Sequence, residues 1–416
     1  MAVSIIQIPS TLFNNAQSPL VFSVNESNAD VKTSSSFQYI AELYYWTGSN
    51  TQSGSTAQYT LEKYPNAAGV GIFDVSRVVS STFTDLLAEN TSSVQYFGID
   101  AYIRYKNNPT GSFITGSHIN YADILGSRIY TQLAVDGYNT FQQTFNASAV
   151  GGVTIQTAPN TTTDFYPILT QGPPTQSFIE DNYGRTSIWA HGGGSGTAYP
   201  QFVHYIDESA VTGSIRLNNA SIASNNTNQM IETIPIGWNE SDFPLSGSIR
   251  NFRIQPIDNS GNLFGSPIYF NYECTKKYDN IRIKWKNSFG AFDYFNFNLV
   301  SRESFNTQRS RYQPQIGSWD KSVLTYEKYE SSIQNYISDS TLKLSVNTDY
   351  VSEDYNDIFK ELMVSDEIYW VYDEANDYVR PLALDTSTFN IKTHVVDKLI
   401  QYQFDFTQGQ GYKLIF

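Results

Sequence analysis

Residues 281–297, IRIKWKNSFGAFDYFNF, alternate apolar and polar side chains on either side of the polar turn NSFG. Because successive side chains of a strand point to opposite faces, this period of two predicts two strands joined by a tight turn. One face of the hairpin is aromatic, and we expect Trp285, Phe295 and Phe297 to be buried against a helix or a facing sheet. An exposed carbohydrate-binding platform is the alternative interpretation of that face.

The composition favours strands in the rest of the chain as well. Tyrosine occurs 30 times and phenylalanine 26 times, and the charged fraction is only 16%. Aromatic residues suit half-buried pleated surfaces, and a chain of 416 residues exceeds one compact core. The sequence therefore predicts a mainly β protein with two or three β-sandwich-like domains, each with at most one or two short packed helices.

Turn signals and changes of period suggest three domains. Residues 1–110 are expected to form an N-terminal β-sandwich with one helix. Residues 111–272 form a loop-rich β region that we interpret as a second sandwich, and residues 273–416 a C-terminal β-sandwich with one helix.

The third domain contains the clearest switch between periods. A strand is predicted over 340–348, and a helix follows in VSEDYNDIFKELMVS. Its apolar stripe is spaced at three and four residues, and Ser352 is the expected N-cap. The stripe consists of Tyr355, Ile358, Phe359 and Leu362.

Charge and cysteine content exclude several classes of protein. The formal net charge is −14, which disfavours specific nucleic-acid binding. Cys274 is the single cysteine, so the chain has no internal disulfide and no thiolate metal cluster. The N-terminal sequence does not resemble a signal peptide, and no window approaches a membrane span. We expect synthesis in a host cytoplasm and no membrane insertion.

No motif predicts an enzyme. HGGGSG at 191–196 resembles the oxyanion-hole sequence of some esterases, but the nucleophile elbow G-x-S-x-G is missing, so we interpret it as a glycine loop. DEANDY at 373–378 lacks the glycine and the final glutamate of a calcium loop. The four histidines have no metal-ligand spacing; they are His118, His191, His204 and His394.

Carboxylates gather in two places without forming a catalytic motif. The first group is at the predicted helix start and the second in turns, and a facing pair for glycan hydrolysis is a possibility that sequence alone does not test. We therefore predict no catalytic, cofactor-binding or metal-binding residues. The carboxylates are Glu353, Asp354 and Asp357, and then Asp366, Glu367, Asp373, Glu374 and Asp377.

Five segments, read in order, resemble virion structural proteins of tailed phages of Bacteroidetes, including the crAss-like phages. They are PNAAGVGIFDVSRVV, DNYGRTSIW, YFNYECTKKYDNIRIKWKNSFGAFDYFNFNL, TLKLSVNTDYVSEDYNDIFKELMVSDEIYWV and DYVRPLALDTSTFNIKTHVVDKLIQYQFDF.

The resemblance implies a non-enzymatic tail or neck component that forms a homo-oligomeric ring around the DNA channel. The other implied partners are tail or portal-proximal virion proteins, and the implied location is the virion tail. The acidic charge is consistent with a channel lining that repels DNA and also with a solvated outer surface.

A receptor-binding or glycan-binding adhesin of a virion or cell surface is the alternative function. Its binding residues would be tryptophans near turns, and the glycine- and threonine-rich stretch 149–200 would be an adhesive loop or a contact to a neighbouring ring. The tryptophans in question are Trp46, Trp189, Trp238 and Trp319.

Overall fold

The protein is mainly β, as predicted, and its computed structural model divides into two compact units. Unit 1 comprises residues 1–275 and 286–294, and unit 2 comprises 276–285 and 295–416. The division into three domains at 110 and 272 stays a prediction. The structure describes residues 3–9, 13–47, 57–83, 94–117, 119–120, 132–138, 168–179, 184–191, 202–207, 210–217, 229–238, 240–245, 249–258, 260–273, 278–320, 322–329, 332–373, 378–393 and 400–409.

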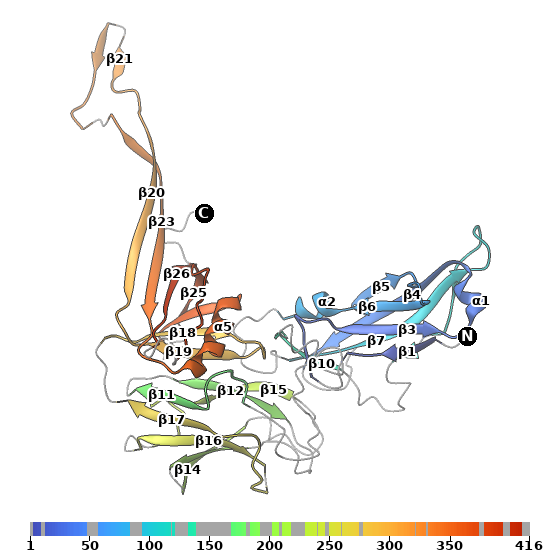
Figure 1. The fold of residues 1–416 in the computed structure, drawn as a ribbon. Coiled ribbons are helices and arrows are strands. Elements are labelled where there is room, and N and C mark those ends of the chain that lie inside the picture. The colour runs from blue at the N-terminus through green and yellow to red at the C-terminus, as the bar shows by residue number, and fades with distance from the viewer. Residues whose placement is uncertain are drawn as a thin grey trace. The chain divides into compact units, whose positions relative to one another are not determined.

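Unit 1 begins with a sandwich of two sheets (Figure 1). One sheet has the order β1-β3-β6, and the other has the path β2-β10-β7-β4-β5, with β8 and β9 also on β7. The strands are β1 Val3–Gln7, β2 Phe13–Asn15, β3 Val21–Glu26, β4 Ser35–Trp46, β5 Tyr59–Lys63, β6 Val70–Asp74, β7 Val94–Lys106, β8 Ile114–Thr115, β9 Ile119–Asn120 and β10 Gln132–Val135; the helices are α1 Ala29–Lys32 and α2 Ser76–Ser80.

Aromatic side chains from both sheets form the core of this sandwich. Phe22 of β3 meets Phe97 of β7 edge to face, with ring centroids 6.2 Å apart. The Tyr39 hydroxyl accepts a hydrogen bond from the Glu26 amide at 3.0 Å and donates to the Gly69 carbonyl at 2.7 Å. The phenol thus satisfies its polar atom inside an apolar core, which buried tyrosines require.

Unit 1 also contains a five-stranded sheet, β11-β17-β16-β13-β14, and the pair β12-β15. Ile188 of β12 and Ile234 of β15 share a buried cluster with Val203 and Tyr205 of β13. The strands are β11 Thr175–Ile179, β12 Arg185–His191, β13 Phe202–Asp207, β14 Ala210–Arg216, β15 Gln229–Pro235, β16 Asn251–Ile257 and β17 Ile268–Glu273.

Unit 2 is one seven-stranded sheet, β19-β18-β24-β25-β26-β23-β20, with a helix packed on it. Its elements are β18 Ile281–Lys286, β19 Phe292–Phe297, β20 Arg302–Tyr312, β21 Ser318–Asp320, β22 Val323–Thr325, β23 Gln334–Asn347, η3 Glu353–Tyr355, α5 Asn356–Val364, β24 Ile368–Asp373, β25 Tyr378–Leu384 and β26 Gln403–Gln408. Within the described part of the chain, no helix has the length and apolar character needed to cross a membrane.

The predicted hairpin and helix are confirmed, and they pack on each other. Trp285 and Phe297 are fully buried, and the ring of Phe295 lies 5.0 Å from that of Phe359 on α5. The predicted stripe faces this core, since Ile358, Phe359 and Leu362 are buried. Ser352 does precede the helical turn η3, but its side chain makes no capping hydrogen bond; its hydroxyl donates instead to Asp354 at 3.4 Å.

The NSFG turn between β18 and β19 also has the expected geometry. Asn287 Oδ1 accepts from the amides of Phe289 and Ala291 at 3.0 and 3.1 Å, and Gly290 has a φ of +72°. A side chain at Gly290 would lie 3.0 Å from the backbone of Asp136, so glycine is required both for φ and for space.

We predict that Phe359→Ala lowers the free energy of unfolding by roughly 3–5 kcal/mol, because it removes a buried ring at the centre of the unit 2 core. Urea denaturation followed by tryptophan fluorescence measures the loss. Lys360→Ala is the control on the exposed side of the same helix, where only the Asp357 contact at 2.7 Å is lost. Equal losses in the two variants would contradict this account of the core.

Candidate functional site

The histidine and carboxylate candidates do not assemble into a described active site. His204 is half-buried on β13, and burial lowers its pKa. His118, His394, the glycines at 192–194 and the turn residues 374–377 lie outside the described residues. Among the residues that are described, no group of three or more His, Cys, Asp or Glu side chains could hold a metal ion.

One buried carboxylate in unit 1 has a strongly shifted pKa. Burial raises the pKa of Asp293 to about 6, although hydrogen bonds from Thr170, Asn287 and the Gln171 amide act in the opposite direction. Asn287 Nδ2 donates both to Asp293 Oδ2 at 3.0 Å and to the Leu169 carbonyl at 2.9 Å. These bonds connect the 286–294 turn to residues 169–171, so we interpret Asp293 as structural.

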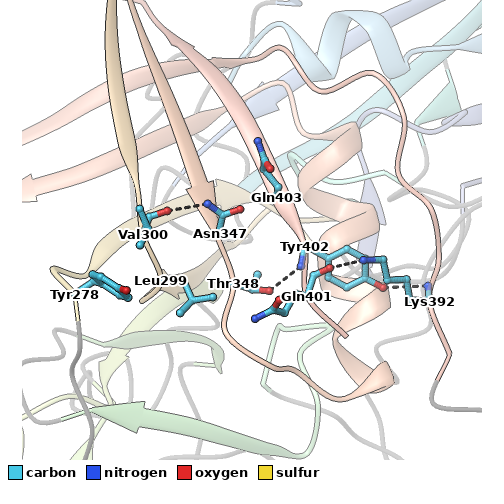
Figure 2. Close-up of a pocket in the computed structure, with 9 residues that line it drawn as sticks. All are labelled: Tyr278, Leu299, Val300, Asn347, Thr348, Lys392, Gln401, Tyr402 and Gln403. Carbon is cyan, nitrogen blue, oxygen red and sulfur yellow. Dashed lines mark hydrogen bonds between the residues drawn. The ribbon is translucent and has the colours of Figure 1, made fainter. Parts of the chain in front are cut away.

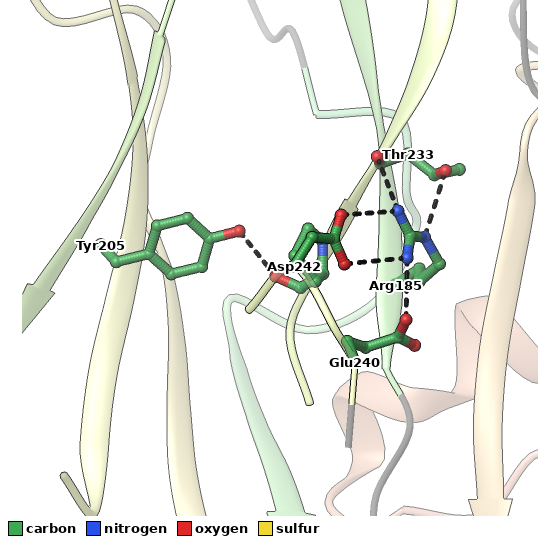
Figure 3. Close-up of polar contacts among 6 residues, drawn as sticks. Arg185, Tyr205, Thr233, Glu240 and Asp242 are labelled. Carbon is green, nitrogen blue, oxygen red and sulfur yellow. Dashed lines mark hydrogen bonds and ion pairs between the residues drawn. The ribbon is translucent and has the colours of Figure 1, made fainter. Parts of the chain in front are cut away.

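Arg185 stands at the centre of a second polar cluster of unit 1 (Figure 3). Its guanidinium contacts Glu240 at 2.8 Å and Asp242 at 3.2 Å. Burial alone would lower the pKa of Arg185, but the two carboxylates outweigh it and raise that pKa. Beside it, the Tyr205 hydroxyl donates to the Pro235 carbonyl at 2.6 Å, so the cluster ties strands and a turn together.

A cavity of about 570 Å³ lies in unit 2 (Figure 2). Its polar groups bond mainly to one another: Lys392 Nζ donates to the Gln401 carbonyl at 2.6 Å, Asn347 Nδ2 to the Val300 carbonyl at 2.7 Å, and the Tyr402 amide to Thr348. With these groups already bonded, the lining offers little to recognise a ligand.

A second cavity of about 560 Å³ shares Tyr278 and Val300 with the first. It contains the aromatic rings of Trp370 and Tyr372, which could stack on a sugar. The guanidinium carbon of Arg380 already lies 4.2 Å from the Tyr372 centroid and 5.3 Å from that of Trp370. Arginine therefore occupies ring faces that a glycan would need.

The tryptophans chosen for glycan binding differ in exposure. Trp46 and Trp189 are buried, and Trp238 is half-buried against Phe243, with centroids 5.1 Å apart. That interpretation is wrong for Trp46 and Trp189, because β4 and β12 place their rings in cores, whereas for the half-buried Trp238 it stays a prediction. Trp319 differs, since 68% of its surface is exposed.

Trp319 lies in a long hairpin that leaves the sheet of unit 2, and we name residues 304–342 the arm (Figure 1). β20 pairs with β23 from Arg302↔Ser345 out to Tyr312↔Gln334. β26 pairs with β23 only over 343–347. The arm itself, from residue 342 outward to its end, is therefore a two-stranded ribbon, and neither of its outer edges is paired to another described strand.

Large hydrophobic side chains are concentrated on the arm. Among the described residues, 25 such side chains are exposed, and the arm carries 11 of them within 39 residues of sequence. They are Phe305, Tyr312, Ile316, Trp319, Val323, Leu324, Tyr326, Tyr329, Ile333, Tyr336 and Ile337. Clustered exposed apolar side chains are one mark of an interaction surface, so the arm is the candidate functional site.

The end of the arm is a small hairpin of β21 and β22. Trp319 lies opposite Leu324, so both side chains project from the same face. Gly317 leads into β21 with a φ of +77°, and a side chain there would lie 2.6 Å from the Thr325 carbonyl oxygen. Glycine at this position is what lets the chain turn and present the pair.

The sequence pattern does not identify the arm. It predicts a strand over 340–348, whereas β23 begins at Gln334, and β20 and β21–β22 are not predicted at all. RESFNTQRSRY lacks an apolar face, so periodicity gives no strand signal. The available signal is the clustering of Trp319, Tyr326, Tyr329 and Tyr336 within one short segment.

Comparisons with known proteins add no family. No family model and no curated protein matches this chain. Among solved structures, fibronectin(III)-like modules of CbhA from Clostridium thermocellum align at 8% identity and a TM-score of 0.16, over 66% of this chain and 94% of theirs. Extracellular domains 3-5 of Drosophila OTK align at 7% identity and a TM-score of 0.22, over 83% and 92%. Likenesses at these scores carry no argument about function.

We predict that Trp319→Phe removes most of the acrylamide-accessible tryptophan fluorescence, because Trp285, Trp189, Trp370 and Trp46 are each at most 9% exposed. The free energy of unfolding should change by no more than about 0.5 kcal/mol. Quenching is measured at dilution, and Trp238→Phe is the matched control. A large loss of stability in Trp319→Phe would show that the indole is packed.

We predict that Asp293→Asn gains stability relative to wild type as pH rises from about 4 to 7. Because the folded-state pKa is raised, wild-type stability from this group is present below pH 4 and is lost as pH rises through 6. The difference should grow by an amount on the order of 3 kcal/mol, measured by urea denaturation at each pH. Asp366→Asn, an exposed carboxylate, is the control, and parallel curves for wild type and Asp293→Asn would contradict the shift.

Proposed function

We propose that this chain is a non-enzymatic structural component of a phage virion tail or neck, and that it assembles through subunit interfaces into a ring around the DNA channel. The observation that carries the proposal is the exposed aromatic arm of unit 2. The resemblance of five segments to virion proteins of tailed phages supports the virion context.

An arm of this kind favours assembly on physical grounds. A two-stranded ribbon is marginally stable in water by itself, and open strand edges invite pairing with another chain. Tyr, Trp and Arg are the residues that dominate binding energy at protein interfaces, and all three occur on the arm. A partner that covers these side chains would stabilise the ribbon and remove the apolar surface from water.

The charge of the whole chain agrees with a position beside DNA without binding to it. A net charge of −14 repels phosphates, so DNA could pass a ring of such subunits without being retained. The partners in this proposal are further copies of the chain and other tail or portal-proximal proteins.

An adhesin is the second candidate function, and one observation favours it. Trp319 and Leu324 form an exposed pair at the end of the arm, and 84% of Tyr329 is exposed close by in sequence. Rings presented in this way can stack on sugars. Binding to a glycan panel that disappears in Trp319→Ala, from a chain that stays monomeric, would favour the adhesin over the ring.

We predict that replacing residues 305–342 by Asn-Gly abolishes assembly and leaves the unfolding midpoint unchanged. Ser304 and Lys343 are directly paired, so a two-residue turn can close the shortened ribbon. Native mass and negative-stain images of the full chain, alone and mixed with tail proteins of the same phage, should show rings that the shortened variant does not form.

Tyr64→Ser removes an exposed tyrosine of unit 1 and is the matched control. Mass spectrometry of purified virions should detect the chain, and antibodies should label the tail. A chain that is absent from virions and never associates would overturn the proposed function.

A further inference from the structure

The ribbon of the arm has one face that carries two arginines and no carboxylate. Directly paired residues of an antiparallel ladder lie on the same face, so the register defines it. Asp339 is opposite Gln308 and therefore belongs to the other face. We name the face that carries the two arginines the arginine face. It consists of Phe305, Thr307, Arg309 and Arg311 of β20 with Leu342, Ser340, Ser338 and Asn335 of β23.

The arginine face continues the core-facing side of the sheet beyond the core. Leu344 lies two residues from Leu342 on the same side of β23 and is 1% exposed in the unit 2 core. Its partner Glu303 is exposed on that side just outside the arm, so the carboxylate-free stretch begins at Phe305. Phe305, paired with Leu342, is 49% exposed. Past them, Arg309 and Arg311 are exposed, and neither makes an ion pair with a described residue. This apolar base is at least partly exposed, and the two cations beyond it are exposed, in the part of the chain that the structure describes.

The charge of the chain indicates what covers it. The arm has four Arg or Lys and four Asp or Glu, so it is formally neutral, and the rest of the chain carries the whole net charge of −14. A carboxylate-free face with two guanidinium groups is complementary to an acidic surface, because guanidinium pairs with carboxylates in bidentate geometry. The body of this same chain is such a surface.

We propose that the arginine face of one copy docks on the acidic body of a second copy, outside the arm of that copy. Arg309 and Arg311 pair with carboxylates there, and Phe305 and Leu342 cover apolar side chains. This inference rests on the proposed function and names the partner surface of its ring. Residues 349–366 are one suitable stretch, with five carboxylates that are not buried, one lysine and the exposed side chains of Tyr350 and Val364.

The geometry of unit 2 favours a contact between copies over one with unit 2 of the same copy. The arm runs away from the sheet and from α5 (Figure 1), and β20 covers roughly 30 Å between Glu303 and Tyr312. The arginine face and the acidic body are different surfaces, so the contact between two copies is head to tail. Such contacts close into a ring when the rotation between neighbours divides a full turn.

Charge reversal tests the proposal in the full-length chain. Arg309→Glu with Arg311→Glu should weaken self-association about tenfold or more, measured by sedimentation velocity over a concentration series, and added salt should weaken wild-type association. The matched control is Lys63→Glu with Arg77→Glu, which changes the net charge equally at exposed positions of unit 1. Unchanged association in the arm variant, or equal loss in the control, would overturn the proposal.

Photo-crosslinking identifies the occupant directly. Asn335 is exposed and lies opposite Arg311 on the arginine face, so p-benzoylphenylalanine at this position probes the face. In a mixture of light and heavy isotope-labelled protein, we expect crosslinks between copies that end outside the arm. Crosslinks confined to one chain, or from arm to arm, would overturn the proposal; p-benzoylphenylalanine at Tyr64 is the control position.

The outcomes separate this inference from the proposed function. Rings that persist in the arginine variant would overturn the docking surface and leave the proposed function intact. A chain found in virions that forms rings only when mixed with other tail proteins would do the same. Duplex DNA binding that depends on Arg309 and Arg311, without self-association, would assign the face to nucleic acid and overturn the proposal.

Discussion

The packing of Phe359 on the aromatic face of the β18–β19 hairpin supports most of unit 2. Its ring contacts Phe295 and Phe404, with centroids 5.0 and 5.3 Å away, and thereby joins α5 to strands that are more than 40 residues distant in sequence on either side. Edge-to-face and tilted ring pairs of this kind add to the burial of apolar area. Leu344 and Val346 belong to the same core, and they hold the base of β23 from which the arm extends.

The arm is anchored by the packed core at its base. The ladder between β20 and β23 starts inside the core cluster and continues outward where no third strand or helix covers it among the described residues. Its backbone hydrogen bonds are paired across the ribbon, but its rings and edges are exposed to water. A partner that covered these rings and edges would remove them from water. We therefore propose a function for the arm and interpret the two cavities and the Arg185 cluster as parts of the scaffold.

Much of the fold could be predicted, for a definable reason. The hairpin at 281–297 and the helix after Ser352 have strong periodicity because each buries one face, and burial selects apolar residues at a fixed spacing. Among the described residues, the side chains of the arm are mostly exposed on both faces, so its sequence carries no such period. Of the four tryptophans near turns, only Trp319 is exposed, because loop proximity in sequence says little about whether flanking strands turn a ring inward.

The sequence by itself determined the strand-rich class, the turn at Asn287–Gly290 and the apolar stripe of α5. Local chemistry sufficed there: alternation, a residue able to adopt positive φ, and helical spacing. Only the tertiary structure decided that Trp46 and Trp189 are core residues, that Asp293 is enclosed by Thr170 and Asn287, and that residues 304–342 leave the sheet as a ribbon. Those outcomes depend on contacts between segments distant in sequence, which no local pattern records.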